Sequence, residues 1–384
     1  MGNDLKTAAH CATPFLHVGG SWLYAQIAGL KRYRSVVLTQ EVQNLDEFPV
    51  EVLHTAEDYA TPQRWLNRIG RKVAGEYPFY AGLLRREGAV LIHAHFGYQG
   101  CRCLRARRTS GLPMVTSFYG ADATSYPRQE KWRRHYQRLF AQGELFLVEG
   151  STLKAGLAEL GCPAEKIRVH QLGVDVERIT FRPRRPSDKV RFLICAPFRE
   201  KKGIPYALEA LGRVVRQGGL DCEIVLIGDG PERQKIEQTI ERAGLAERVQ
   251  MRGFLPYSEV IEELAHCHIL LQTSTTAADG DTEGGAPVIL LDAQASGLPV
   301  VATRHADIPE YVRDGQSALL APERDVEAIA RCLGQLLEAP ERWAEMGKAG
   351  RRHVEQNYNA ALQRQRLELI YDELLRDHAS GGCA

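Results

Sequence analysis

The chain has 384 residues and a formal net charge of +1, with 25% of its residues charged and 44% hydrophobic. This is the composition of an ordinary globular protein, and its near neutrality gives no support for a nucleic-acid partner. The length exceeds what one hydrophobic core usually spans, so we expect two domains. No run of about 18 apolar residues occurs and no signal peptide is evident, which favours a cytoplasmic location.

Short apolar runs alternate with helical stretches through the first half of the chain. We expect strands at residues 35–39, 50–54, 90–95, 114–118 and 144–149. Their connections are mostly long enough for crossover helices, which indicates a parallel sheet. Ligands of such sheets bind at the carboxyl ends of the strands, so residues that follow a strand are candidates for function.

Small, polar or aromatic residues stand at these positions. They are Gly19, Gly20, His93, His95, Tyr119 and Asp122. The turn at Gly19 and Gly20 is either an ordinary connection or part of a ligand loop. The alternation of side chains along a strand places His93 and His95 on the same sheet face, where a satisfied polar role is more usual than catalysis. Asp122 could equally cap a helix or close a turn.

Basic side chains gather in two runs. The first comprises Arg102, Arg105, Arg107 and Arg108, and the second comprises Lys131, Arg133 and Arg134. A solvated helix face is the favoured interpretation of such runs. The alternative is a surface for a phosphorylated acceptor or for anionic lipid, which would give the protein a peripheral membrane contact.

A segment rich in proline and arginine begins near residue 171 and indicates a domain boundary. Beyond it, strands are expected at residues 190–196, 224–227, 249–254, 268–273 and 300–303. Arg199 and Lys202 lie in the loop after the first of these strands, where basic side chains can neutralise a diphosphate without a metal. Gly228 lies in a tight turn after the second strand, beside the expected ligand.

The most informative stretch is a glycine-rich loop followed by a helix and a strand. Gly284, Gly285 and Ala286 have little or no side chain, so their backbone N–H groups can point at an anion near the helix N-terminus. Carboxylates flank them at Glu283 and Asp292 and could hold sugar or ribose hydroxyls. This mixture suits a nucleotide-sugar, although acids near a helix start often serve only as caps.

Several of these segments resemble the retaining glycosyltransferases of sequence family four. They are HAHFG at 93–97, KKG at 201–203, GDGP at 228–231, and the pair Glu283 and Asp292 followed by SGLPVV. The chain also departs from the family pattern. Asp292 replaces a glutamate and lies one residue further on than usual, Tyr119 stands where many relatives have histidine, and Pro197 stands where they have arginine.

The resemblance implies the GT-B fold, an α/β architecture in which two Rossmann-like domains with parallel sheets face a central cleft. The acceptor-side domain would span residues 1–175 with a returning helix at about 359–384, and the donor-binding domain would span residues 176–358. The implied activity is transfer of a hexosyl group from a UDP- or GDP-sugar to an acceptor hydroxyl with retention of anomeric configuration. No metal or cofactor is implied beside the donor. Asp279 and Asp281, spaced like a metal-binding D-x-D, are the minority interpretation.

The resemblance also assigns roles to residues. The donor diphosphate would be held by Lys202, Arg199, the amides of Gly284, Gly285 and Ala286, and Gly19 or Gly20. Glu283 would hold the donor sugar and Asp292 the ribose. The remaining donor-site candidates are Gly228, Gly253, Phe254 and Pro287. Tyr119, His93, His95 and Asp122 are candidates on the side of the acceptor, which could be a saccharide, a lipid-linked precursor or a small molecule.

Two other functions stay open on the same fold. The departures at Pro197, Tyr119 and Asp292 motivate a non-catalytic nucleotide-sugar-binding protein. The second alternative is an enzyme that hydrolyses the donor or epimerises its sugar. Product analysis without an acceptor would separate the second alternative from a transferase.

Overall fold

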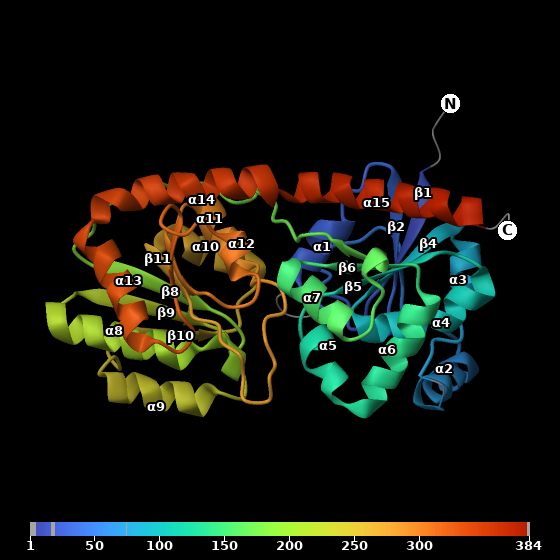
Figure 1. Cartoon of the computed structure of the whole chain (residues 1–384), viewed down its shortest axis with the longest axis horizontal. Coiled ribbons are helices and arrows are strands. Elements are labelled where there is room, and N and C mark those ends of the chain that lie inside the picture. The colour runs from blue at the N-terminus through green and yellow to red at the C-terminus, as the bar shows by residue number, and fades with distance from the viewer. Residues whose placement is uncertain (1–4, 17–19, 74, 382–384) are drawn as a thin grey trace. The chain divides into compact units, whose positions relative to one another are not determined.

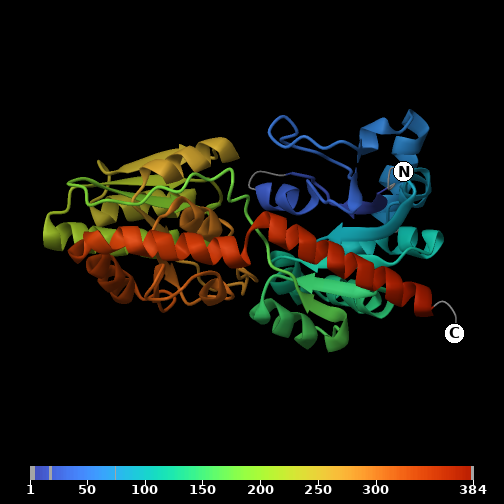
Figure 2. The same cartoon turned by 90° about the horizontal axis from the view of Figure 1, so that it is seen from above.

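The computed structural model describes residues 5–16, 20–73 and 75–381. The chain divides into two compact units (Figures 1 and 2), one formed by Met1–Leu172 with Ala360–Ala384 and the other by Gly173–Asn359. Each unit has one parallel sheet with apolar clusters on both of its faces. Within the described chain, no helix has the length and hydropathy needed to cross a membrane.

The first unit contains a seven-stranded sheet in the order β3-β2-β1-β4-β5-β6-β7, and every pairing is parallel. The strands are β1 Lys6–Cys11, β2 Tyr33–Leu38, β3 Leu53–His54, β4 Ala89–His95, β5 Met114–Phe118, β6 Leu145–Val148 and β7 Ile167–Val169. β1 is central and was not expected from the sequence. Its residues are mostly small rather than β-branched, and they are buried because neighbouring strands flank β1 on both sides.

Helices connect these strands. They are α1 Ser21–Ile27, α2 Thr61–Val73, α3 Tyr80–Arg86, α4 Gly97–Ser110, α5 Ala121–Thr124, α6 Glu130–Gln142 and α7 Ser151–Glu159. The last helix, α15 (Ala360–Gly381), also packs on this unit, although it follows the second unit in the chain. The Glu368 carboxylate accepts hydrogen bonds from the backbone N–H groups of Lys31 and Arg32 at 2.6 and 2.7 Å. Tyr371 is fully buried against the sheet, so α15 is part of the core.

The second unit contains a six-stranded sheet in the order β10-β9-β8-β11-β12-β13, again wholly parallel. The strands are β8 Val190–Cys195, β9 Cys222–Ile227, β10 Val249–Gly253, β11 Ile269–Gln272, β12 Val300–Thr303 and β13 Ala318–Ala321. The helices are α8 Ile204–Gly218, α9 Arg233–Ala243, α10 Tyr257–His266, α11 Ile289–Ser296, α12 Ile308–Tyr311, α13 Val326–Glu338 and α14 Trp343–Asn357. The predicted α/β class with two parallel sheets is confirmed.

Two glycines let loops approach each other closely beyond the strand ends of the second sheet. Gly203 ends the short 3-10 turn Glu200–Lys202 with φ +60°, and a Cβ there would lie 1.9 Å from the carbonyl oxygen of Thr273. Gly228 follows β9 with φ +134°, and its Cβ would lie 2.0 Å from the carbonyl oxygen of Ala196. Neither position accommodates a side chain, so both glycines are required for this packing.

Gly203→Ala should therefore lower the free energy of unfolding much more than Gly219→Ala, which provides a matched control. Both glycines have φ +60°, but nothing lies within 4 Å of a Cβ at Gly219. We expect a loss of about 1 kcal/mol at Gly219 from backbone strain alone, and roughly 3 kcal/mol or more at Gly203, where a backbone carbonyl must also move. Urea unfolding measures both, and equal losses would show that the close approach does not constrain the loop.

Candidate active site

The donor-site candidates of the second unit follow the carboxyl ends of its parallel strands. Arg199 and Lys202 follow β8, Gly228 follows β9, Gly253 ends β10, and Phe254 comes directly after it. The loop after β11 carries the remaining candidates and leads into α11. Because all the strands are parallel, these loops leave the same edge of the sheet.

Lys202 and Glu283 form a largely buried ion pair at this edge. The Lys202 ammonium lies 2.6 Å from a Glu283 carboxylate oxygen, and the side chains are only 12% and 6% exposed. The Ser274 hydroxyl donates to the other carboxylate oxygen at 2.6 Å. Burial alone would raise the pKa of Glu283, but the charges of Lys202 and Lys201 and the hydrogen bonds outweigh it and lower the pKa. Glu283 is thus a carboxylate at neutral pH.

A second layer of polar residues holds Glu283, and the sequence analysis missed it. The backbone N–H of Glu283 donates to His305 Nε2 at 3.1 Å, so His305 carries its proton on Nδ1 and donates it to Glu323 at 2.6 Å. Glu323 also accepts from the backbone N–H of Thr276 at 2.8 Å. The sequence could have indicated these residues by their positions after predicted strands, since Ser274 lies just beyond β11 and His305 just beyond β12.

Lys201 fixes the same loop from the other side. Its ammonium lies 3.1 Å from the Asp281 carboxylate and donates to the carbonyl of Thr282 at 2.8 Å. The Asp279 carboxylate accepts from the backbone N–H of Asp281 at 2.9 Å, as in a tight turn. The structure therefore gives the D-x-D carboxylates roles in shaping the loop.

The glycine-rich segment before α11 presents unpaired backbone N–H groups. In the part of the chain that the structure describes, the amides of Gly285 and Ala286 have no hydrogen-bond acceptor. Gly284 has φ +77°, and Pro287 accepts the first turn bond from Leu290 at 3.1 Å. These amides lie next to Glu283 in sequence and just before the helix N-terminus, an arrangement that suits an anion.

Asp292 lies within α11 and is almost completely buried. The Tyr257 hydroxyl donates to one of its carboxylate oxygens at 2.9 Å. Burial raises the pKa of Asp292 to about 7, and the bond from Tyr257 offsets only part of this rise. The structure thus places Asp292 on the same helix that begins beyond the bare amides, and its contact with a ribose stays a prediction.

Three donor-site candidates are more exposed. The Arg199 side chain is exposed and, within the described residues, has no hydrogen bond or ion pair. Gly253 has φ +65° with open space around it, and Phe254 is 50% exposed at the end of β10. These positions leave side chains and backbone accessible to a ligand, and their contact with a nucleobase stays a prediction.

His93 and His95 lie in the first unit, where His10 of the neighbouring strand β1 joins them in a fully buried cluster. The ligand atoms of the three rings lie within 4.8 Å of one another, as a metal site would require. Their nitrogens, however, are engaged in hydrogen bonds. His93 bonds the hydroxyls of Tyr371 and Ser117 at 2.6 and 2.7 Å, and His10 lies 3.1 Å from His95. The rings thus form a buried polar network, and their contact with an acceptor stays a prediction.

One assignment of protons satisfies the contacts of this cluster. Burial lowers the pKa of His10 to about 3 and also lowers that of His95, so each neutral ring has one N–H. Ser35 donates its proton to the carbonyl of Ile27 at 2.7 Å, which leaves its oxygen to accept a long contact of 3.5 Å from His10 Nε2. His10 Nδ1 then accepts from His95 Nε2, and His95 Nδ1 accepts from the Tyr119 hydroxyl at 2.7 Å.

In this assignment the Tyr119 hydroxyl gives its only proton to His95, which leaves its oxygen to accept a hydrogen bond from a further partner. Burial raises the pKa of Tyr119, so the phenol keeps that proton. Its ring packs against Trp22 with centroids 4.5 Å apart. The contact of Tyr119 with a ligand stays a prediction.

Asp122 closes the turn between β5 and α5. Its carboxylate accepts from the backbone N–H groups of Gly97, Tyr119 and Gly120 at 2.8, 3.1 and 2.9 Å. It is buried, which favours the structural interpretation left open above. Gly20 lies at the start of α1, whereas Gly19 lies outside the described residues.

Comparisons with known proteins match the chain to glycosyltransferases. A family model described as glycosyl transferases group 1 matches residues 175–353, and one described as glycosyltransferase family 4 matches residues 27–178. The chain is 36% identical over 289 residues to the amylovoran biosynthesis glycosyltransferase AmsK of Erwinia amylovora, covering 74% of this chain and 70% of that one. It is 34% identical over 285 residues to the putative colanic acid biosynthesis glycosyltransferase WcaL of Escherichia coli K12, covering 73% and 70%.

Solved structures show the same fold. Anabaena Alr3699/HepE in complex with UDP and glucose matches with a TM-score of 0.76 at 18% identity, covering 96% of this chain and all of that one (100%). Sucrose-phosphate synthase of Thermosynechococcus elongatus matches with a TM-score of 0.74 at 15% identity, covering 97% and 100%. The fold and the matched families define a glycosyltransferase with the GT-B fold. More narrowly, the chain belongs to glycosyltransferase family 4, among the group 1 glycosyl transferases, which confirms the resemblance seen in its motifs.

Asp292→Asn should remove a pH dependence of stability. In the unfolded chain an aspartate has a pKa near the ordinary value of 3.8, whereas burial raises it to about 7 here. Between these values only the folded state binds the proton, so the free energy of unfolding contributed by Asp292 falls as pH rises, at most about 1.4 kcal/mol per pH unit, and levels off above the folded pKa. Urea unfolding between about pH 5 and pH 8 measures the slope.

The matched control is Asp188→Asn, because Asp188 is exposed on the surface of the same unit. Wild type and Asp188→Asn should share one slope, while Asp292→Asn should be flatter. An unchanged slope in Asp292→Asn would contradict the raised pKa.

Tyr119→Phe should destabilise the first unit by about 1–3 kcal/mol, because His95 Nδ1 would lose its donor inside the core. Tyr126→Phe is the control, since Tyr126 is only partly buried and has no hydroxyl hydrogen bond within the described residues. Chemical denaturation compares the two variants. Equal stability of the two variants would mean that the Tyr119 hydroxyl does not donate to His95.

Proposed function

We propose that this chain transfers a sugar from a nucleoside diphosphate sugar to an acceptor hydroxyl, with retention of anomeric configuration and without a metal. The observation that supports this most directly is the Lys202–Glu283 pair beside the free amides of Gly285 and Ala286. A cation and bare amides suit a diphosphate, and a carboxylate suits sugar hydroxyls. The groups that would bind the diphosphate and the group that would bind the sugar thus lie in one loop region.

Each residue then has a distinct task. Lys202 and the amides would stabilise negative charge on the departing diphosphate, which is where charge develops in the transition state. Glu283, kept ionised by its neighbours, would accept hydrogen bonds from the donor sugar and could not act as an acid. Arg199, exposed and without a partner in the described chain, is available as a second phosphate ligand. Asp292 is the proposed ribose ligand.

The proposed reaction needs no protein nucleophile, because the one bond that breaks at the sugar is matched by one that forms. The bond from the anomeric carbon to the diphosphate oxygen breaks, and a bond to the acceptor oxygen forms on the same face of the sugar. The proton of the acceptor hydroxyl passes to the departing phosphate. The first unit would supply acceptor contacts, with the Tyr119 oxygen accepting from an acceptor hydroxyl.

The acceptor we propose is a saccharide hydroxyl in a polysaccharide precursor. The curated relatives AmsK and WcaL carry names that place them in amylovoran and colanic acid biosynthesis. The first solved neighbour was crystallised with UDP and glucose, and UDP-sugars are therefore the first donors to test.

Nucleotide binding can be tested by thermal stabilisation with UDP, GDP, ADP and TDP, each with EDTA or with Mn²⁺. A ligand that binds only the folded state raises the melting temperature. We expect one nucleotide to raise it equally under both conditions. A rise only with Mn²⁺ would move the site to Asp279 and Asp281, and no rise with any of the four would contradict the donor site.

Transfer itself is tested by incubating the matching nucleotide-sugar with an oligosaccharide acceptor and determining the anomeric configuration of the product by NMR. Retention supports the proposal. Free sugar formed at the same rate with or without acceptor would identify a hydrolase, and a changed sugar still attached to the nucleotide would identify an epimerase. Tight binding with no turnover across acceptors would identify a binding protein.

Lys202→Ala should reduce kcat at least about 100-fold, since it removes a charge that acts on the leaving group. Because this also leaves Glu283 buried without its cation, the double variant Lys202→Met with Glu283→Gln separates the fold from the chemistry. The double variant should keep the wild-type melting temperature while remaining inactive. Lys189→Ala, at a lysine 56% exposed in the same unit, should leave kcat unchanged. Full activity of the double variant would refute the assigned roles.

A further inference from the structure

Helix α2 (Thr61–Val73) exposes its apolar side chains and buries a polar one. Seven large apolar side chains are exposed among the described residues, and three of them are Trp65, Leu66 and Ile69 of this helix, at 65%, 52% and 38%. With 3.6 residues per turn, the three fall within about 100° of one another. Asn67 lies about 160° from Ile69. Asn67 is 3% exposed and donates to Gln40.

This arrangement is the reverse of the usual one, in which a surface helix turns its apolar stripe inward. The apolar stripe of α2 is therefore available to a partner outside the chain. In Figure 1, α2 lies at the margin of its unit. A helix that presents so much apolar surface needs a partner that covers it, because patches of this kind are rare on monomers without a function.

Basic side chains border the apolar stripe. Arg64, Arg68 and Lys72 are all exposed on α2. A tryptophan with aliphatic neighbours, flanked by arginine and lysine, is the pattern of a helix that lies in the plane of a membrane interface. The long basic side chains reach lipid phosphates while the apolar side chains enter the acyl boundary. The composition thus favours an anionic bilayer over a neutral apolar partner.

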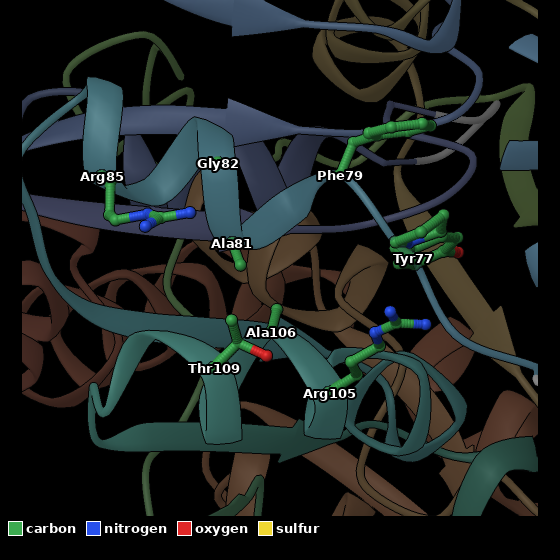
Figure 3. Close-up of a pocket in the computed structure, with 9 residues that line it drawn as sticks. Tyr77, Phe79, Ala81, Gly82, Arg85, Arg105, Ala106 and Thr109 are labelled. Atoms are coloured by element: carbon green, nitrogen blue, oxygen red, sulfur yellow. The ribbon is translucent and has the colours of Figure 1, made fainter. Parts of the chain in front are cut away.

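A cavity of about 270 Å³ lies beside α2, between α3 and α4. Given that a water molecule occupies about 30 Å³ of liquid, the cavity has room for a phosphate group. Figure 3 shows Arg85 and Arg105 on opposite sides of the lining, on different helices, with Ala81 and Ala106 between them and the Arg105 side chain directed towards Tyr77. Thr109 adds a hydroxyl to the lining.

The two arginines of the cavity differ from the other basic residues nearby. Arg107 and Arg108 pair with Glu144 and Glu76, and Arg102 donates to the Tyr77 hydroxyl at 3.1 Å. Within the described chain, the side chains of Arg85 and Arg105 have no hydrogen bond or ion pair. Two guanidinium groups without counter-charges at one cavity suit an anion with several oxygens.

Helix α2 packs against the wall of the cavity. A Cβ at Gly70 of α2 would lie 3.1 Å from the ring of Pro78, which lines the cavity. The rings of Tyr59, just before α2, and of Phe79, in the cavity wall, have centroids 5.2 Å apart. A lipid phosphate in the cavity and an apolar stripe in the acyl boundary can thus belong to one bound surface.

We propose that α2 and the Arg85–Arg105 cavity together dock this protein on an anionic lipid bilayer. Trp65, Leu66 and Ile69 enter the interface, and the two cavity arginines bind phosphate groups of the lipid headgroups. Vesicle binding needs no sugar transfer, so this inference and the proposed function can fail separately.

Co-sedimentation with vesicles of phosphatidylcholine alone, or mixed with phosphatidylglycerol, tests the proposal on the full chain. We expect binding to the mixed vesicles, weakened by salt, and at least about tenfold weaker for Trp65→Ser with Leu66→Ser and Ile69→Ser. Leu369→Ser, at a leucine 49% exposed on α15, is the matched apolar control and should bind as wild type. Wild-type binding by the triple variant would overturn the role of α2.

A double variant with its own matched control tests the role of the cavity. Arg85→Gln with Arg105→Gln should lose most of the preference for phosphatidylglycerol, whereas Arg133→Gln with Arg134→Gln, exposed arginines of α6, should keep it. An unchanged preference in the cavity variant would overturn the headgroup site. Free inorganic phosphate that displaces the protein from vesicles at low concentration would show that the cavity takes a soluble anion, which also overturns the lipid assignment.

Fluorescence provides a direct measure of where α2 goes. The chain has four tryptophans, so the blue shift on adding mixed vesicles must be compared with Trp65→Phe. We expect the shift in wild type and its loss in Trp65→Phe, which removes the indole without removing the apolar character of the position. A shift that persists in Trp65→Phe, or dissociation of a protein dimer by the triple variant, would mean that the stripe does not meet lipid.

Discussion

The strand-end loops of the second sheet depend on placing cations and carboxylates together where water is scarce. Lys202 with Glu283, and Lys201 with Asp281, join the turn after β8 to the loop after β11. A single buried charge at either position would be costly, so each residue needs the other to be tolerated. The result is a loop held in place before any ligand arrives, with its free amides already fixed. Preorganisation of this kind reduces what must be rearranged when charge develops in a reaction.

The polar residues buried in the first unit follow a different principle. Burial keeps the imidazoles of His10 and His95 neutral, and one arrangement of protons then satisfies the contacts from Tyr119 through both rings to Ser35. A phenol at this position can therefore orient a partner hydroxyl but cannot relay charge inward. Tyr119, which stands where the family resemblance led us to expect a histidine, is thus supported by its own buried network.

The sequence predicted the α/β class and most of the strands because apolar runs separated by long connections are compatible with few folds other than a parallel sheet covered by helices. It did not reveal β1, whose small side chains look unremarkable until two neighbouring strands cover them. Lys202 and Glu283 were identified individually from motifs, yet their contact spans 81 positions in the chain and no local pattern encodes it. His305 and Glu323 escaped notice for the same reason. The direction of the hydrogen bonds at Tyr119 could not be known without His10, which only β1 brings near.

The position of α15 affects the order in which the two units can complete their folding during synthesis. The helix supplies Glu368 and Tyr371 to the first unit, yet it is synthesised after every residue of the second. On the ribosome, the second unit can therefore complete its core while the first still lacks one of its helices. Domains usually fold in the order of their synthesis. Here the unit that begins first finishes last, and until then the face of its sheet around Leu91 and Val115 has no cover from the C-terminal helix.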